Sequence, residues 1–366
     1  MYTSSLSNNY LEYLEKTVMA YSDKVKRHLV KQFIQHGIAT KQTDTSGQLY
    51  IEGLETVDIS EKTLSEQLVT CIHQSKRAGY ALEKWEFLKD YKYSVIFTCN
   101  DFSSTLKKAK EIIPLENTYE NDYLYTSFVK PVAYSMDGYY FLKFNLAYAA
   151  IHPLTQEEFL TKYPFLVVFH EKGELIEFRF DVLKRVFLSD KKEPTIYSNL
   201  IAEMSDYFKE HFECDLIPLN LDFMVNVCKR DENVKLIAQS MKLPNGGNAQ
   251  LDVGNNQEYI LPFIGELRSL LNDNQAELEK VPDFREALEQ FMFEMEEMSD
   301  YPWIELLWEN EIKTRSNRVK FVFNYMNKSY CLIQYYYSNV LIGMERMNYV
   351  IEYIVNHRND DTTQNE

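Results

Sequence analysis

Apolar residues recur at spacings of three and four over two stretches near the start of the chain, and this is the period of an α-helix. The first helix is expected to run unbroken to Gly37, because glycine readily adopts the backbone conformation that ends helices. The second begins at Thr63, which has the spacing of a capping box with Glu66. A short β-like stretch at 49–51 separates them, so 1–90 is assigned to a helical N-terminal unit, either winged-helix-like or a plain helical cap.

The centre of the chain carries short aromatic and apolar runs of the kind that form β-strands. Residues 93–99 read as one such strand. The dipeptide Asp137-Gly138 separates two aromatic runs, and 170–173 separates two others, so each pair of runs is predicted to form a hairpin. Strands joined by hairpins usually pair with their sequence neighbours. Residues 91–262 are therefore expected to form an α+β core around an antiparallel sheet.

Beyond the hairpins, strands are predicted at 219–228 and 234–243, and the helical period returns after residue 262. Two sets of apolar residues have this helical period, and each set is called a seam. The first consists of Phe284, Leu288, Phe291, Met295 and Met298. The second consists of Ile333, Tyr336, Val340, Met344, Met347, Ile351 and Ile354. The seams are expected to pack as an antiparallel helix pair, which makes 263–358 a helical C-terminal unit and 359–366 a disordered tail.

The fold class that follows is α+β, with a central antiparallel sheet and helical N-terminal and C-terminal units. With 45% hydrophobic and 26% charged residues, the chain can bury a sizeable core. No run of apolar residues is long enough for a transmembrane helix, and the N-terminus lacks the pattern of a signal peptide. Five scattered cysteines form neither a disulfide framework nor a paired metal motif. These features predict a cytoplasmic protein that does not enter a membrane.

The acidic charge is concentrated in one region. Residues 273–311 hold thirteen acidic side chains and only two basic ones, in a chain whose net charge is −16. The electric field of this concentrated negative charge attracts a basic partner and repels nucleic acid. The Met and Phe residues among the acids are typical of interfaces. A solvated helix face is the alternative interpretation. The predicted partner-binding residues are Glu289, Phe293, Glu296 and Glu297, and the predicted partner is a protein with a basic surface.

A smaller basic cluster lies on the first predicted helix, where four residues share one face because of their spacing. They are Lys24, Arg27, His28 and Lys31. A stripe of this kind can follow the phosphates of a nucleic acid, although four groups are a small footprint on an acidic chain. These residues are the candidate nucleic-acid site, with a solvated helix face as the alternative.

Signatures of metal binding are weak. His211 and Cys214 form one pair of possible ligands, and Cys71 and His73 form another. Four ligands of these types would suit zinc if the two helices met, but nothing in the sequence brings them together and neither spacing belongs to a standard zinc finger. No metal ligand and no cofactor is predicted.

Catalytic signatures are equally sparse. The pattern Glu177-Phe178-Arg179 resembles the Asp/Glu-x-Lys element of a metal-dependent nuclease, but it has an arginine where a lysine would share a proton. The chain has neither a nucleophile elbow nor a glycine-rich phosphate loop. A glycine cluster within 245–256 is read as a turn, although its amides are of the kind that bind anions. No catalytic residue is therefore predicted.

Together these patterns predict a non-enzymatic interaction subunit of a cytoplasmic multi-protein complex that acts through an acidic, Met- and Phe-rich helical surface. Abundant Lys, Asn, Ile and Tyr are typical of AT-rich bacterial genomes, and by association this suggests an antiphage or mobile-element system. The alternative is a nucleic-acid-binding sensor or a divergent metal-dependent nuclease.

Overall fold

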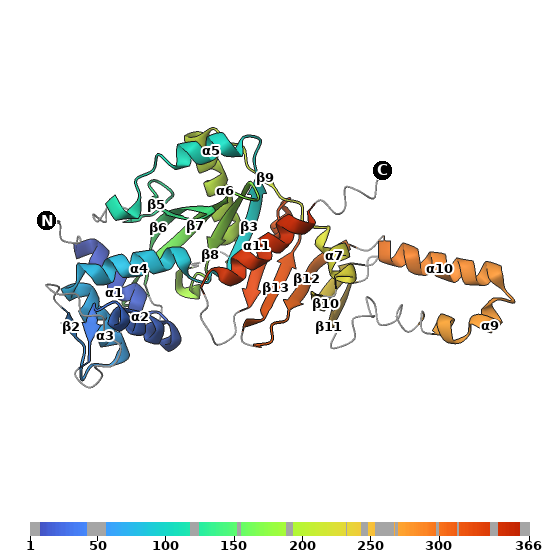
Figure 1. The fold of residues 1–366 in the computed structure, drawn as a ribbon, viewed down its shortest axis with the longest axis horizontal. Coiled ribbons are helices and arrows are strands. Elements are labelled where there is room, and N and C mark those ends of the chain that lie inside the picture. Colours follow the sequence, from blue (N-terminus) through green and yellow to red (C-terminus); the bar gives the residue numbers. More distant parts are fainter. Residues whose placement is uncertain are drawn as a thin grey trace. The chain divides into compact units, whose positions relative to one another are not determined.

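The fold is α+β and rich in antiparallel strands, as the sequence predicts (Figure 1). A computed structural model describes residues 8–41, 56–117, 124–151, 155–187, 193–231, 233–242, 248–252, 267, 270–297, 300–312, 315–336 and 343–358. The chain divides into two compact units. Unit 1 comprises Met1–Ile217 with Leu341–Glu345, and unit 2 comprises Pro218–Val340 with Arg346–Glu366.

Unit 1 begins with four helices. They are α1 (Asn8–Met19), α2 (Asp23–Gln35), α3 (Leu64–Gln74) and α4 (Lys76–Leu88). The single first helix expected from the sequence is instead two, because Ser22 has an extended backbone and its side chain caps α2 at Val25. Gly37, with φ +63°, follows α2 as predicted. The capping box of Thr63 and Glu66 at the start of α3 is confirmed.

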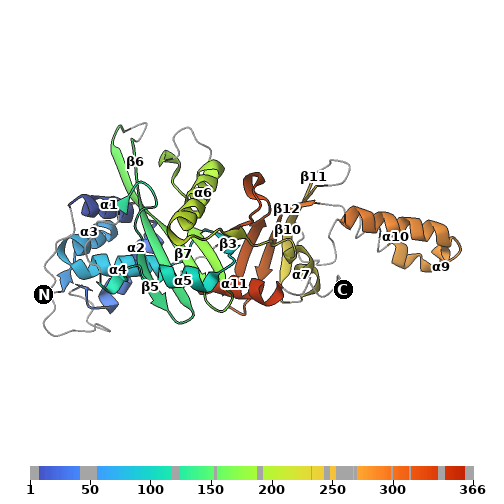
Figure 2. The same ribbon diagram turned by 90° about the horizontal axis from the view of Figure 1, so that it is seen from above.

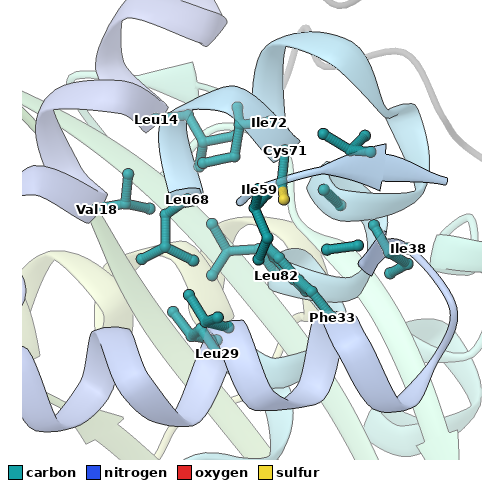
Figure 3. Packing of buried hydrophobic residues seen from close by; sticks show 14 of the residues in the cluster. Leu14, Val18, Leu29, Phe33, Ile38, Ile59, Leu68, Cys71, Ile72 and Leu82 are labelled. Carbon is teal, nitrogen blue, oxygen red and sulfur yellow. The ribbon is translucent and has the colours of Figure 1, made fainter. Parts of the chain in front are cut away.

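These helices enclose one apolar core, seen from close by in Figure 3. Between α2 and α3, two short parallel strands, β1 (Ala39–Thr40) and β2 (Val57–Asp58), bring Ile38 and Ile59 into this core. The predicted β-like stretch at 49–51 lies outside the described residues. The residues labelled in Figure 3 are Leu14, Val18, Leu29, Phe33, Ile38, Ile59, Leu68, Cys71, Ile72 and Leu82.

The remainder of unit 1 is built on a mainly antiparallel sheet. Its strands are β3 (Tyr93–Thr98), β4 (Leu124–Tyr125), β5 (Val132–Met136), β6 (Tyr139–Ile151), β7 (Glu158–His170) and β8 (Leu175–Phe180). Their order is β3-β8-β7-β6-β4, and β5 also pairs with β6 (Figures 1 and 2). Both predicted hairpins are confirmed, and the turn between β5 and β6 is Asp137-Gly138, with Gly138 at φ +75°.

One face of this sheet is aromatic and carries α6 (Glu193–Phe212). The ring of Phe208 lies 5.8 Å from that of Phe178 and 6.0 Å from that of Phe169, between ring centroids. Tyr207 packs edge-on against Phe144 at 4.9 Å. Helix α5 (Phe102–Ala109) begins at Asp101, whose carboxylate accepts a hydrogen bond from the backbone N–H of Ser104. The opposite face of the sheet carries charged side chains.

Unit 2 contains the strands β10 (Lys235–Lys242), β11 (Asn248–Asp252), β12 (Asp300–Trp308), β13 (Asn317–Val322) and β14 (Leu332–Tyr336). Their order is β11-β10-β12-β13-β14, and every neighbouring pair is antiparallel. The described helices of this unit are α7 (Met224–Arg230), α9 (Gln275–Leu278), α10 (Pro282–Glu297) and α11 (Glu345–His357).

The structure corrects two predictions about this part of the chain. The second half of the predicted strand at 219–228 lies in the helix α7, whereas the strand at 234–243 is confirmed as β10. The region 263–358 is not all helical, because it contains β12, β13 and β14. The second predicted seam therefore divides, so that Ile333 lies in β14 whereas Ile351 lies in α11. Helical spacing alone does not separate short apolar strands from buried helix segments.

Candidate functional site

The acidic region predicted to bind a partner contains α9, α10 and the whole of β12. Both of its basic residues are already paired with acids in their own helical segment. Lys280 Nζ lies 2.7 Å from Glu277 Oε2, and Arg285 Nε lies 2.7 Å from Glu289 Oε1. Glu305 and Glu309 of the same region pair with Arg318 and Lys235, so the remaining acidic surplus lies mainly on α10.

Two of the three described residues of the first apolar seam are exposed, which contradicts the prediction that they pack against a second helix. Phe284 is 59% exposed and Phe291 is 47% exposed, whereas Met292 is buried at 5%. Phe284, Leu288 and Phe291 follow the spacing i, i+4 and i+7, so they share one face of the helix. Acidic residues flank that face. The acidic helix surface is defined here as Phe284, Leu288 and Phe291 together with Asp283, Glu286 and Glu289.

Of the predicted partner-binding residues, the structure describes the side chain of Glu289, which is exposed and paired with Arg285. Phe293, Glu296 and Glu297 lie within α10, but their side chains fall outside the described residues. All four residues thus lie on one helix, and their role in binding stays a prediction. The sequence also predicted a core position for Phe291, and this is wrong, because Phe291 is exposed.

The four basic residues proposed for nucleic acid all lie on α2. Arg27 and Lys31 are exposed, whereas Lys24 and His28 are partly buried. Burial lowers the pKa of His28, and the nearby Lys31 lowers it further. The imidazole therefore favours its neutral form at pH 7, which leaves a stripe of three positive charges.

The two His/Cys pairs have separate surroundings. Cys71 is buried in the core of the helical region, and burial raises its pKa to about 12. His73 Nε2 lies 3.0 Å from Glu15 Oε2, and the ring of His211 stacks on Tyr207. Within the residues that the structure describes, no group of three or more His, Cys, Asp or Glu side chains is arranged to hold a metal ion.

The nuclease-like pattern is buried. Glu177 and Arg179 have no exposed surface, and Glu177 Oε2 lies 2.8 Å from both Arg179 Nε and His170 Nε2. Burial alone would raise the pKa of Glu177, but Arg179 and His170 outweigh it and hold that pKa below its usual value. His170, interpreted from the sequence as a turn residue, belongs to this buried ion group.

A larger ion cluster was not found by sequence reasoning. Glu83 and Glu86 of α4 meet Lys143 of β6 and Lys162 of β7, and all four are buried. Both ammonium groups lie 2.7 Å from Glu86 Oε2 and also pair with Glu83, to which Tyr10 of α1 donates a hydrogen bond. The two acids and two bases balance, so the cluster fastens α1 and α4 to the sheet without a buried net charge.

The cluster and the Glu177 group share one face of the unit 1 sheet. Residues that face each other across strands point to the same side, and Lys143 faces Leu166, which in turn faces Arg179. The alternation of Tyr140, Leu142, Phe144 and Leu146 along β6 was a signal that Lys143 and Asn145 belong to a separate face. Phe141 on that face indicated that both faces of the strand are covered, and the structure confirms this, because Phe141, Lys143 and Asn145 are all buried.

No protein-family model matches this chain, and no curated protein is significantly similar to it. Among the described helices, none combines the length and the apolar character needed to cross a bilayer.

Proposed function

We propose that this protein is a non-enzymatic interaction subunit whose acidic helix surface binds a partner protein with a basic, partly apolar surface. The observation that carries the proposal is the exposure of Phe284 and Phe291 on one face of α10 among unbalanced acids. A helix that keeps two phenylalanines in water gains free energy when a partner covers them. Apolar anchors at the centre of a polar rim are the usual arrangement of a protein interface.

The two kinds of residue have separate roles in this proposal. The acids attract a basic partner over a distance and set the association rate, which falls with salt. The phenylalanines make close contact and set the lifetime of the complex. The further assignment to a cytoplasmic complex of a bacterial antiphage or mobile-element system rests on residue usage alone and belongs to the same proposal.

The test compares full-length variants in affinity purification from the native host, followed by binding kinetics with each purified partner. Phe284→Ser/Phe291→Ser is expected to lose the partner, whereas the matched control Ile151→Ser/Val182→Ser, which changes two exposed apolar residues of unit 1, keeps it. Reversing Glu289, Glu296 and Glu297 to Lys is expected to slow association and flatten its salt dependence. Partners recovered equally by all variants, at equal rates, would overturn the proposal.

The alternative, nucleic-acid sensing, is favoured by one observation, namely that Arg27 and Lys31 are exposed one turn apart on α2. Binding of duplex DNA through this stripe would weaken as salt rises, with a slope of about −0.9 for each phosphate contacted. Arg27→Gln/Lys31→Gln would then reduce that slope, and the absence of salt-dependent DNA binding excludes the alternative.

A further inference from the structure

Two cysteines that are far apart in the sequence meet in unit 1. Cys99 directly follows β3 and is partly buried, whereas Cys214 comes two residues after the end of α6 and is buried. Both are free thiols, and the thiol of Cys99 donates a hydrogen bond to the sulfur of Cys214. The fold therefore brings a pair of reduced sulfur atoms together, which the scattered positions of the cysteines in the sequence do not indicate.

Helix α5 positions the segments that carry the two cysteines. Thr105 Oγ1 lies 4.0 Å from Cys99 Sγ. Three residues further along α5, Lys108 Nζ lies 2.7 Å from Oε2 of Glu213, the residue before Cys214. Positions i and i+3 are neighbours on a helix surface, so both segments lie against the same side of α5.

Hydrogen bonds and a turn also fix the chain on each side of the pair. Glu213 has φ +54°, a left-handed conformation of the kind that ends helices, and the N–H of Cys214 donates back to a carbonyl of α6 across 3.3 Å. Thr98, the residue before Cys99, donates from Oγ1 to the carbonyl of Ile217 across 3.3 Å. The approach of the two sulfur atoms is therefore supported by contacts that do not involve either thiol.

We propose that Cys99 and Cys214 form a redox site, which reacts with a disulfide of low molecular weight and is converted into a reversible protein disulfide. The partly exposed Cys99 meets the oxidant first, and the buried Cys214 completes the bond. In a reducing compartment the pair remains a dithiol until oxidant accumulates. The bond would then fasten the end of α6 to the end of β3.

The reaction consists of two thiol–disulfide exchanges. The Cys99 thiol gives its proton to water, and its thiolate attacks one sulfur of the small disulfide, so that a mixed disulfide forms and one small thiolate leaves. The Cys214 thiolate then attacks the Cys99 sulfur of the mixed disulfide and expels the second small thiolate. The two small thiolates take up the two protons. Two protein thiols are thereby oxidised to one disulfide, and one small disulfide is reduced to two small thiols.

The surroundings of Cys99 make the first exchange slow at neutral pH. Burial raises the pKa of Cys99 to about 11, with a further contribution from Cys214, while a hydrogen bond with Thr105 opposes the rise. The charged groups beside the pair, Lys108 and Glu213, are already paired with each other. Because the thiolate is the form that attacks, the rate is expected to increase about tenfold for each pH unit between about pH 7 and pH 9.

The experiment treats the reduced, folded, full-length protein with oxidised glutathione at about pH 8, where exchange is faster than at neutral pH. The remaining thiols are then alkylated, and the peptides are identified by mass spectrometry without reduction. The wild type is expected to lose two of its five free thiols and to give one cross-linked peptide that joins Cys99 to Cys214. Dithiothreitol should restore both thiols. The melting temperature of the oxidised protein should be higher, because the bond closes a long loop of chain.

Single variants separate the two steps. Cys214→Ser is expected to stop after the first exchange, with one glutathione on Cys99, and Cys99→Ser is expected to give no cross-link. Cys228→Ala is the control, since it removes a buried thiol of unit 2 and should keep both the cross-link and the rise in melting temperature. Thermal melts of the reduced variants show whether each one folds.

The wild-type protein alone decides the outcome if a variant fails to fold. Five free thiols after prolonged oxidation would overturn the proposal. So would a glutathione adduct that persists on Cys99 while Cys214 stays free, and so would a cross-link to any other cysteine. None of these results depends on the acidic helix surface, so the proposed function stands or fails separately.

Discussion

Lys143 of β6 donates a hydrogen bond to Glu86 of α4 across 2.7 Å, at a position where neither side chain has any exposed surface. Removing two such charges from water is costly, and their mutual attraction offsets that cost only when each charge stays paired. Here Lys162 and Glu83 complete the pairing. The stability of unit 1 should therefore depend on the balance of the cluster more than on the presence of charge.

Removal of one base is the direct test of this balance. Lys143→Met leaves two buried carboxylates facing the single ammonium of Lys162, and we expect it to lower the free energy of unfolding by about 3–5 kcal/mol. Urea denaturation followed by circular dichroism measures the change.

The matched control removes a balanced pair. Lys143→Met/Glu86→Leu leaves Glu83 and Lys162 as one neutral pair, so the double variant should be more stable than Lys143→Met alone. If the second substitution adds its own loss instead of recovering stability, the pairing does not explain the cluster.

Acid should destabilise the protein through its buried carboxylates. Despite burial, the neighbouring cations hold the pKa values of Glu83 and Glu177 below the usual carboxyl value of 4.5. The folded state therefore binds fewer protons than the unfolded state in this range. The stabilisation is full above about pH 4.5 and is lost as the pH falls towards the lower folded-state pKa values.

Urea denaturation at several pH values between about 3 and 7 should show this loss. In Glu177→Gln the slope of stability against pH should become shallower below about pH 4.5, even though Arg179 loses its partner and overall stability falls. Equal slopes in the wild type and in Glu177→Gln would contradict the assignment.

The turn between β5 and β6 should be sensitive to the residue at position 138. Gly138 has φ +75°, and a Cβ built there meets nothing within 4 Å, so the cost of substitution is backbone strain and not collision. We expect Gly138→Val to lower stability by about 1–3 kcal/mol and Gly138→Asn to lower it less, because asparagine tolerates this conformation. Thermal melts of the two variants should differ, and equal melting temperatures would show that the strain is relieved locally.

Local patterns in the sequence were sufficient to predict those elements that a few adjacent residues determine. Thr63 with Glu66 predicted a helix start, and Asp137 with Gly138 predicted a hairpin, because caps and turns are set by a few adjacent residues. The strands β12 and β14 were missed, and 319–323, which overlaps β13, was left open as a short strand or a helix start, because short apolar runs fit the period of a strand as well as that of a helix. What selects a strand there is pairing with residues distant in sequence.

The buried charges show a second limit of prediction from the sequence. A lysine in an aromatic strand, such as Lys143, gives no sign in the sequence of where its partners lie, and Glu83 is 60 residues away. The acidic helix was recognisable from charge alone. Which of its apolar residues are covered depends on neighbours in space, and this is why Phe291 was wrongly assigned to a core.

Two adjacent residues of α10 provide the sharpest test of that correction. Phe291 is 47% exposed, so Phe291→Ala should change the free energy of unfolding by no more than about 0.5 kcal/mol. Met292 is 5% exposed, and Met292→Ala should cost about 2–5 kcal/mol because it removes buried apolar contacts. Denaturant melts of the two variants measure both values in one protein. Should Phe291→Ala prove the more destabilising, the seam is buried after all, and the acidic helix surface loses the exposed aromatic anchor on which binding depends.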